Sequence, residues 1–583
     1  MSKIFLILLV LQMGCSGHKI AKHSELPHFI PFAPNYQQQR NLYEARGKSY
    51  AIAGQGVHSA RGVERIFESG GNIADAATAY TFLISVERPQ STGIGGGGFL
   101  LFYEKKSQKV YALDFREMAP HSADAKMFLD RNSLVIPGKS LTGIFSSGVP
   151  GLVAGILEFH AKFGKLPLSK VMAPAIELAS NGFFVYPELE HALKTEEQNL
   201  RKFSENLKVF FKQGELLKEG DKVVQSDLSK TLRIISQKGR RGFYSGTVAK
   251  KIIQQAHELG GDLSLTDLKG YQVKWRQPVS GSYKKFKIFS MSPPSSGGVH
   301  IIQILNMLEH ENLRKWGPYH PHSIHMVASA MQAAFADRAK YLGDPDFVAV
   351  PVAKLISKDY AQRRRDEIPY QRALKFDEVK PGVVTLPGYE SSQTTHFSLT
   401  DKEGNIVVST QTINGFFGSA VMVKGTGIIL NNEMDDFATK VGESNMFGAI
   451  GGENNLVAPR KRPLSSMSPT IIINKEGVPV LGLGSPSGTR ILTCVAQTIL
   501  NYLEYGMPLY NAISSLRYHH QWSPDYIRVE EVGLPDFSQQ ELRRMGYNIV
   551  KKDLGCRVSA VSREGDEVLA VSDPRGQGLS ISR

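Results

Sequence analysis

The sequence predicts a folded α+β protein, on three observations. Hydrophobic residues make up 42% and charged residues 21% of the 583 positions, which is ordinary for a globular chain and argues against disorder and against a polytopic membrane protein. Apolar residues recur three and four positions apart through much of 150–375, as in helices packed on a core. Strand-like segments begin at Thr394. Length alone favours several domains.

The first fifteen residues have the pattern of an export signal. Lys3 precedes an apolar run over 4–11, which is too short to span a bilayer but suits the core of a signal peptide. Cys15 follows at once and is a candidate lipidated N-terminus of a bacterial lipoprotein, although Gln12 stands where such sites usually carry an aliphatic residue. We therefore expect a signal peptide over 1–15, an N-terminal extension over 16–49, and an exported protein that is either periplasmic or anchored by a lipid at Cys15.

The formal net charge of +14 raises the question of a nucleic-acid partner. The basic clusters at 363–365 and 460–462 are short and lack interleaved aromatic residues. They lie beside proline and glycine, so solvated loops are the expected explanation. We expect no nucleic-acid partner, although a basic exterior would attract anionic substrates or lipids.

Cysteine and histidine usage gives no sign of a metal site. Cys494 and Cys556 would remain in the mature body, which permits at most one disulfide, and two unpaired thiols are the simpler expectation. His519 and His520 are adjacent, so on a strand their side chains would point to opposite faces. We expect no metal and no other cofactor.

The region from 50 to 101 predicts two helices followed by a glycine-rich loop and a strand. The helices are expected over 56–68 and 74–86, and the glycines occupy 95–98. These glycines lack the Gly-Lys-Ser/Thr ending of a phosphate-binding loop and no strand precedes them, so close backbone approach is the expected role.

The region from 150 to 375 predicts mostly helices. Apolar spacing marks 152–163, 171–179 and 324–342, and turn-rich segments at 293–298 and 343–345 interrupt the pattern. Residues 366–393 are polar and proline-rich, as in an exposed linker. The segments 394–400 and 406–412 then predict a β-hairpin with its turn at 401–405, so Thr394 opens a strand directly after a linker.

A threonine in this position can be a nucleophile only under one condition. Its hydroxyl proton is held too tightly at neutral pH unless a base lies beside it. A free α-amino group, whose ordinary pKa is about 8, can be that base when it belongs to the same residue. Thr394 would therefore have to become the first residue of a chain cut between Gln393 and Thr394.

Several long sequence motifs support a cut before Thr394 more strongly than the position of this residue alone. They include QTTHFS (393–398), NNEMDDF (431–437), KRPLSSMSPT (461–470), GIGGGGF (93–99), DFRE (114–117), LGDPDF (342–347), and shorter matches at 337–338 and 572–575. With these strings the chain resembles the γ-glutamyltransferase family over roughly 50–575. The resemblance implies an N-terminal-nucleophile hydrolase fold, a four-layer αββα sandwich. One composite domain would be formed by a large fragment (50–393) and a small catalytic fragment (394–583), which stay together as a heterodimer.

The resemblance also implies roles for individual residues. Thr394 would be the nucleophile and Thr412 would support it and assist self-cleavage. The γ-glutamyl donor carries an α-carboxylate and an α-ammonium, which require cationic and hydroxyl donors on one side and acidic or amide acceptors on the other. The residues implied for these two groups are Arg116, Ser465 and Ser466 for the carboxylate, and Asn414, Glu433 and Asp436 for the ammonium. The residues alone leave open that Arg116 pairs with Asp114 or Glu117 on the surface and that 435–436 is a solvated turn. His396 is left out of the mechanism.

An oxyanion formed on the γ-carbonyl needs preorganised donors, which backbone N–H groups of a glycine-rich turn supply. The segment 484–488 fits that place, with Ser487 and Gly488 as the implied donors. Many family members carry two glycines here, so Ser487 is a departure. Phe447 is a second departure, in a lid position where bacterial relatives frequently carry tyrosine.

The implied activity is transfer of a γ-glutamyl group from glutathione or another γ-glutamyl compound to Thr394, and then to water or to an amino acid or dipeptide acceptor. No cofactor is needed, because one residue supplies both nucleophile and base. Two alternatives stay open. The first is an acylase acting on glutaryl or cephalosporin side chains, or a relative that processes poly-γ-glutamate. The second is a non-catalytic surface lipoprotein of the same fold.

Overall fold

The computed structural model describes residues 36–380, 394–446 and 448–583. The expected signal peptide, Cys15, Gln393 and Phe447 lie outside the described residues.

Two seven-stranded antiparallel sheets lie at the centre of the molecule. In spatial order the first sheet consists of β1 (Glu44–Gly47), β22 (Glu567–Ser572), β21 (Ser559–Glu564), β17 (Pro479–Gly484), β16 (Thr470–Ile473), β11 (Phe286–Ser290) and β10 (Val279–Tyr283). The second consists of β23 (Gly578–Ser582), β2 (Tyr50–Gln55), β12 (Thr395–Asp401), β13 (Ile406–Thr412), β3 (Gly97–Glu104), β4 (Lys109–Asp114) and β9 (Lys274–Arg276).

Each sheet combines strands from both sides of the expected cut. In the second sheet β12 and β13 lie between β2 and β3, and in the first sheet β16 pairs with β11. Because these ladders alternate between the two halves of the chain, neither half contains a complete sheet. The αββα body is therefore built jointly by residues before and after position 394.

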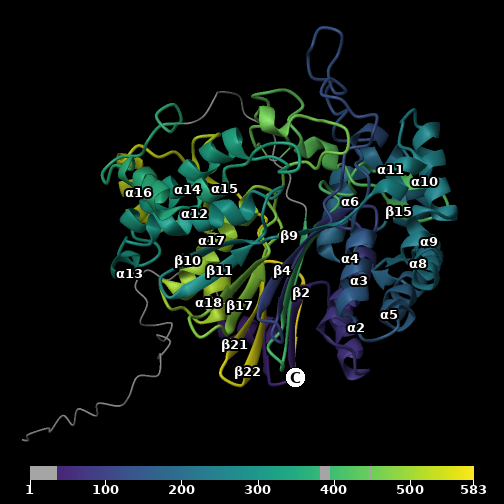
Figure 1. The fold of residues 1–583 in the computed structure, drawn as a ribbon, viewed down its shortest axis with the longest axis horizontal. Helices are drawn as coiled ribbons and strands as arrows, with labels where there is room; N and C mark the ends of the chain where they lie inside the picture. The colour runs from purple at the N-terminus through teal and green to yellow at the C-terminus, as the bar shows by residue number, and fades with distance from the viewer. Residues whose placement is uncertain (1–35, 381–393, 447) are drawn as a thin grey trace, which may run out of the picture.

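Helices cover the outer face of each sheet (Figure 1). The layer on the second sheet contains α2 (Val57–Glu68), α3 (Ile73–Glu87), α4 (Leu152–Phe163) and α5 (Leu168–Asn181), and further out α6 (Pro187–Arg201), α7 (Ser204–Phe210), α8 (Ser226–Lys238), α9 (Arg240–Tyr244), α10 (Thr247–Glu258) and α11 (Leu265–Gly270). The layer on the first sheet contains α12 (Gly297–Leu308), α13 (Leu313–Trp316), α14 (Pro321–Tyr341), α15 (Val352–Leu355), α16 (Lys358–Asp366), α17 (Arg490–Leu503), α18 (Leu509–Ser514) and α19 (Asp536–Arg544).

The remaining elements are short. They are α1 (Tyr36–Tyr43), the pairs β5 (Phe183–Phe184) with β8 (Lys222–Val223), β6 (Phe211–Lys212) with β7 (Glu215–Leu216) and β14 (Met422–Val423) with β15 (Ile428–Ile429), and a small sheet of β18 (Tyr518–His519), β19 (Ile527–Val529) and β20 (Ile549–Lys551). No helix within the described residues is long and apolar enough to cross a membrane.

The predicted hairpin is confirmed by β12 and β13, which pair antiparallel along their whole length. The predicted helices at 152–163, 171–179 and 324–342 are confirmed by α4, α5 and α14. The structure also contains strands that the sequence did not predict. The strand β2 precedes the first helix, and the short strands β9, β10 and β11 lie within the mostly helical region 150–375.

The glycine run over 95–98 lies where chains approach closely, as predicted. A Cβ atom on Gly96 would lie 2.0 Å from the carbonyl oxygen of Thr412, and one on Gly95 would lie 2.1 Å from that of Ile429. No other residue type fits these contacts without moving the backbone. The run therefore fixes β3 against the end of β13.

The basic clusters are not the solvated loops that composition suggested. Arg364 and Arg365 are buried on α16, where Arg364 pairs with Glu367 at 2.5 Å and Arg365 pairs with Glu311. Arg462 is buried as well and pairs with Asp114 at 3.0 Å. Arg365 and Arg462 each have a carboxylate partner from a distant segment, whereas the partner of Arg364 lies three residues further along the chain.

Two further expectations need correction. Cys494 on α17 and Cys556 form a disulfide rather than two free thiols. The segment after α16 was expected to be an exposed linker throughout; most residues of its described part, 367–380, are exposed, but Ile368, Ala373 and Val379 are buried in the core. Ala373 is buried, and its N–H donates to the carbonyl of Met545 at 2.7 Å.

Candidate active site

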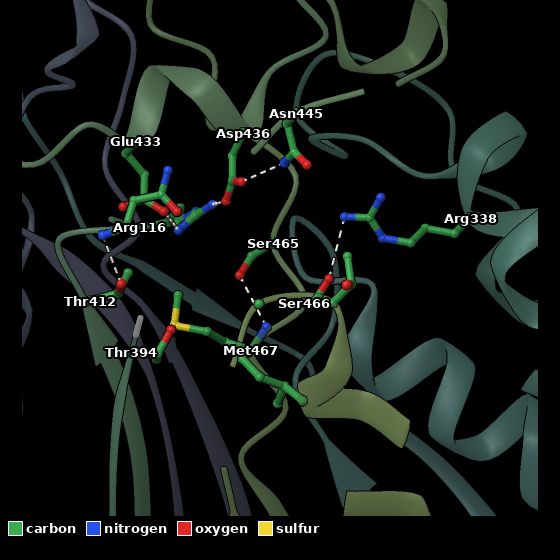
Figure 2. A pocket seen from close by; sticks show the side chains of 14 residues that line it. Arg116, Arg338, Thr394, Thr412, Glu433, Asp436, Asn445, Ser465, Ser466 and Met467 are labelled. Carbon is green, nitrogen blue, oxygen red and sulfur yellow. Dashed lines mark hydrogen bonds and ion pairs between the residues drawn. The ribbon is translucent and has the colours of Figure 1, made fainter. Parts of the chain in front are cut away.

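A small cavity lies at the end of the second sheet where β12 begins and β13 ends. All of the predicted site residues except Ser487 line it together, and Figure 2 shows most of them converging on one space. The lining residues are Arg116, Arg338, Thr394, Thr412, Asn414, Glu433, Asp436, Asn445, Ser465, Ser466, Met467, Gly488, Thr489 and Ile491.

Strand register places the two predicted threonines opposite each other. Thr395 pairs with Gln411 in the β12–β13 ladder, so one step further Thr394 faces Thr412. Side chains opposite each other in such a ladder lie about 5 Å apart at Cβ. Thr394 is 6% exposed and the Thr412 hydroxyl accepts the backbone N–H of Asn414 at 2.8 Å. The Thr394 side chain therefore stands at the cavity wall beside a second, oriented hydroxyl.

A buried charge cluster forms the wall next to Thr412. Arg116, which follows β4, donates hydrogen bonds to the carboxylates of Glu433 and Asp436. Asp436 also accepts from the side-chain amide of Asn445 at 2.8 Å. The surface alternative for Arg116 is wrong, because its side chain is buried and its partners come from the 433–436 turn, which is buried too.

The protonation of this cluster follows from its burial. Burial raises the pKa of Glu117 to about 7 and also raises that of Glu433, with the neighbouring Glu117 carboxyl adding to the Glu433 shift and Arg116 opposing both. Two carboxyl groups so placed do not both ionise readily. At neutral pH the pair therefore carries less than two negative charges. Arg116 keeps its proton because, although burial lowers its pKa, the neighbouring carboxylates of Glu433 and Asp436 raise it by more.

The segment 465–468 is held by the loop 293–298, which was predicted only as a turn-rich interruption of the helical region. The Ser296 N–H donates to the Ser465 carbonyl at 2.8 Å, the Ser465 N–H donates to the Pro294 carbonyl at 2.8 Å, and the Ser295 hydroxyl donates to the Met467 carbonyl at 2.6 Å. This ladder fixes the two predicted serines at the cavity.

The predicted oxyanion turn follows β17. Ser487 has a φ of +118° and Gly488 a φ of +54°, so a serine occupies a backbone region that glycine adopts more readily. The Ser487 hydroxyl donates to the Leu554 carbonyl at 2.6 Å and accepts from Arg490 at 3.1 Å, away from the cavity. Within the described residues, neither the Ser487 nor the Gly488 N–H donates to a backbone carbonyl.

His396 is a structural residue. Its two ring nitrogens lie 2.8 Å from the Thr410 hydroxyl and 3.0 Å from the Ser398 hydroxyl. Burial lowers the pKa of His396 to about 3, so the ring is neutral, and it packs against Gly484 of the opposite sheet. Its exclusion from the mechanism agrees with these contacts.

Sequence reasoning missed Arg338 and Asn445 as cavity residues. The pair 337–338 was among the matching strings but received no role, and nothing in the sequence near Asn445 marks its contact with Asp436. Within the described residues, no group of three or more His, Cys, Asp or Glu side chains is arranged to hold a metal ion.

Comparison with known proteins agrees with the geometry. The family model described as gamma-glutamyltranspeptidase matches residues 60–582. The glutathione hydrolase proenzyme of Escherichia coli (strain K12) is 44% identical over 512 residues, which cover 88% of this chain and 87% of that protein. A cephalosporin acylase from Bacillus halodurans has a similar structure, with a TM-score of 0.82 at 25% identity over 93% of this chain and 97% of that one. The gamma-glutamyltranspeptidase of Helicobacter pylori is 43% identical with a TM-score of 0.55, over 57% of this chain and 95% of that one.

Two facing antiparallel sheets between helical layers, with the site at the head of a central strand, define the class of N-terminal-nucleophile hydrolases. Within that class the family match extends over nearly the whole chain. The chain belongs to the γ-glutamyltranspeptidase family.

Proposed function

We propose that this chain is the precursor of a γ-glutamyltransferase and glutathione hydrolase in which Thr394 is the nucleophile. The observation that carries the proposal is the position of Thr394 at the head of β12, opposite Thr412 and on one cavity wall with the Arg116 cluster. A buried site with cations, carboxylates and hydroxyls side by side suits a ligand end that is itself zwitterionic.

Maturation would begin with attack of the Thr394 hydroxyl on the carbonyl carbon of Gln393. The peptide C–N bond breaks, an ester forms, and water hydrolyses it to leave a carboxylate on Gln393 and a free α-amino group on Thr394. The Thr412 hydroxyl, oriented by the Asn414 N–H, is the group placed to assist this step.

In catalysis the new α-amino group takes the proton of the Thr394 hydroxyl as its oxygen attacks the γ-carbonyl. The oxyanion is stabilised by the N–H groups of Ser487 and Gly488. The amine returns the proton to the leaving nitrogen, the amide C–N bond breaks, and cysteinylglycine or another amine departs. Water or an acceptor amine then attacks the ester, gives its proton to the α-amino group and releases the product and the hydroxyl.

The α-amino acid end of the donor matches the charge cluster. Ser465, Ser466 and the guanidinium of Arg116 would bind the α-carboxylate, while Asn414, Glu433 and Asp436 would accept hydrogen bonds from the α-ammonium. Glu433 and Asp436 already lie beside Arg116, so the ammonium would enter an acidic environment. A glutaryl group lacks the ammonium and would leave these acids without it, which favours the glutamyl donor over the acylase alternative.

The decisive experiment is a denaturing gel combined with release of p-nitroaniline from γ-glutamyl-p-nitroanilide. We expect two fragments and activity in the wild type, neither in Thr394→Ala, and partial retention of both in Thr394→Ser. Thr400→Ala is the matched control, because that hydroxyl lies on the same strand and bonds to the Asn405 carbonyl in the hairpin turn. An intact, inactive wild-type chain would contradict the proposal and leave a binding protein of this fold.

Export also belongs to the proposal. The Cys494–Cys556 disulfide supports it, because disulfides persist mainly in oxidising compartments. The signal segment 1–15 would direct the chain to the periplasm, with a lipid anchor at Cys15 or without one. Metabolic labelling with a radioactive fatty acid separates the two. Label that is lost in Cys15→Ala indicates a lipoprotein, and unlabelled protein released with the periplasmic fraction indicates simple secretion.

A further inference from the structure

Arg338 lies on α14 and reaches the cavity from the side opposite Arg116 (Figure 2). Its side chain is buried, with the whole residue 5% exposed. The Nε atom donates to the Ser296 hydroxyl at 3.1 Å and an Nη atom donates to the Ser466 hydroxyl at 3.4 Å. Its partners are therefore hydroxyl groups.

Several other buried arginines among the described residues have carboxylate partners. Arg116 pairs with Glu433 and Asp436, and Arg462 pairs with Asp114. In the part of the chain that the structure describes, no carboxylate lies within ion-pair distance of Arg338. Asp436, which lines the same cavity, attracts Arg338 only from beyond ion-pair distance. A buried cation with no carboxylate in contact is costly, so its retention beside a cavity points to an anion that arrives with the ligand.

The neighbouring acid does not fill this role. Asp337 precedes Arg338 on α14 but faces away from the cavity, where it accepts the Tyr360 hydroxyl at 2.9 Å and the side-chain amide of Gln303. The side chains of successive helix residues point about 100° apart, so the side chains of Asp337 and Arg338 lie in different environments.

The hydrogen-bond directions fix the orientation of Ser466. Its oxygen accepts from the Arg338 guanidinium, which has no lone pair to accept in return. The Ser466 hydroxyl proton must then be donated elsewhere, and the cavity that Ser466 lines is the space available to it. Arg338 is itself held by Ser296, whose hydroxyl donates to the Ser465 carbonyl at 2.9 Å.

We infer that Arg338 is a positioning residue for the α-carboxylate of the donor. It acts through Ser466 by orienting the Ser466 O–H toward that carboxylate, and it adds positive charge to the same wall of the cavity. This inference rests on the proposed function. The loop 293–298 contributes to the same arrangement, because the Ser296 hydroxyl hydrogen-bonds both to Arg338 and to the backbone carbonyl of Ser465.

The test compares competitive inhibition by three small acids in mature wild type and in Arg338→Gln. L-glutamate has both α-groups, glutarate lacks the ammonium, and 4-aminobutanoate lacks the α-carboxylate. A lost charge-assisted hydrogen bond reduces affinity roughly 10- to 100-fold. We expect the inhibition constants of L-glutamate and glutarate to rise by that factor, and that of 4-aminobutanoate to change by less than about 3-fold. KM for γ-glutamyl-p-nitroanilide should rise far more than kcat falls.

A double-mutant comparison tests the route through Ser466. Ser466→Ala and Arg338→Gln together should raise the L-glutamate inhibition constant by clearly less than the product of the two single effects. Fully multiplicative effects, or equal weakening of all three acids by Arg338→Gln, would overturn the inference.

Two further variants keep the test valid if Arg338→Gln matures poorly. Arg338→Lys keeps the charge but not the two-point geometry, and should show the same selectivity at a smaller size, roughly 3- to 10-fold. Arg364→Gln is the matched control, because Arg364 is a buried arginine that contacts α14 at the Ala333 carbonyl, 3.2 Å away, but does not line the cavity. It should lower the melting temperature without changing the selectivity.

A wild type that is inactive on γ-glutamyl-p-nitroanilide would count against the proposed function, whereas an active wild type with an unselective Arg338 variant would count against this inference alone.

Discussion

Thr394 and Thr412 lie one step beyond the Thr395–Gln411 pair that ends the β12–β13 ladder, Thr394 directly before β12 and Thr412 at the end of β13. The Thr412 hydroxyl is held by the Asn414 N–H at 2.8 Å, so its direction is set before any substrate binds. In the proposed mechanism, a hydroxyl in that place stabilises charge on the neighbouring threonine oxygen during both self-cleavage and acyl transfer.

Thr412→Ala is therefore expected to slow fragment formation, and to lower kcat of whatever matures, by roughly 10- to 100-fold. Thr412→Ser keeps the hydroxyl and should stay within about 5-fold of the wild type. Band intensities on a denaturing gel over time give the first rate, and p-nitroaniline release gives the second. Normal maturation and kcat in Thr412→Ala would show that this hydroxyl has only a structural role.

Ser487 offers a test of backbone strain. Its φ of +118° is costly for a residue with a Cβ atom, while its hydroxyl bonds to the Leu554 carbonyl and to Arg490. Ser487→Ala keeps the strain and loses both bonds, so it should destabilise the protein by about 1–3 kcal/mol. Ser487→Gly relieves about 1 kcal/mol of strain and should be the less harmful change. Thermal unfolding of the mature protein checks the order.

The same pair of variants separates side chain from backbone in catalysis. The implied oxyanion donor at this position is a backbone N–H, which both substitutions retain. We expect kcat of Ser487→Gly within about 3-fold of wild type. A loss of 100-fold or more in Ser487→Gly at unchanged stability would mean that the hydroxyl itself takes part in the reaction.

The sequence allowed the site residues to be predicted because they lie in long, specific strings, and nine of the ten line one cavity. It did not predict Arg338, whose partner Ser466 is 128 residues away, or the burial of Arg462, whose partner Asp114 is 348 residues away. Such pairs exist only after the sheets assemble. A charged residue looks solvated in a sequence until its distant partner is known.

The short strands could not be predicted from the sequence for a related reason. β9 has three residues and lies at the edge of the second sheet, while β10 and β11 have five residues each at the end of the first. Segments of this length carry too few alternations for a period of two to stand out from turns. The hairpin of β12 and β13 was visible because each strand has seven residues and a polar turn separates them.

Buried acids make the stability of this protein depend on pH. Burial raises the pKa of Asp435 to about 7 from an ordinary value of 3.8, against the hydrogen bonds donated by the Met446 N–H and the Ser140 hydroxyl. The neighbouring carboxylate of Asp436 adds to the increase. Because the folded pKa lies above the unfolded one, the stabilising contribution of this group is complete below about pH 4 and is lost as the pH rises through about 7.

Asp435→Asn should therefore flatten the fall in unfolding free energy between pH 5 and pH 8 by about 2 kcal/mol. Glu117, whose pKa is raised in the same direction, should leave part of the slope in place. Asp566→Asn is the matched control, since Asp566 is exposed in the turn between β21 and β22. Denaturant unfolding at the two pH values measures the slope, and an unchanged slope in Asp435→Asn would contradict the assignment.

The disulfide between Cys494 and Cys556 closes a loop of 62 residues within the second half of the chain. It ties α17, which follows the proposed oxyanion turn, to the segment that leads into β21, where the Leu554 carbonyl accepts the Ser487 hydroxyl. The loop-entropy relation gives about 4 kcal/mol for a loop of this length, as an upper expectation. Cys494→Ser with Cys556→Ser should lower the melting temperature by several degrees, and a reductant should lower that of the wild type but not that of the double variant.

Because the disulfide also supports the turn that carries Ser487 and Gly488, kcat should fall when the disulfide is removed, at temperatures where the fold persists. If reduction lowers stability but leaves kcat unchanged, the turn is held by its hydrogen bonds alone.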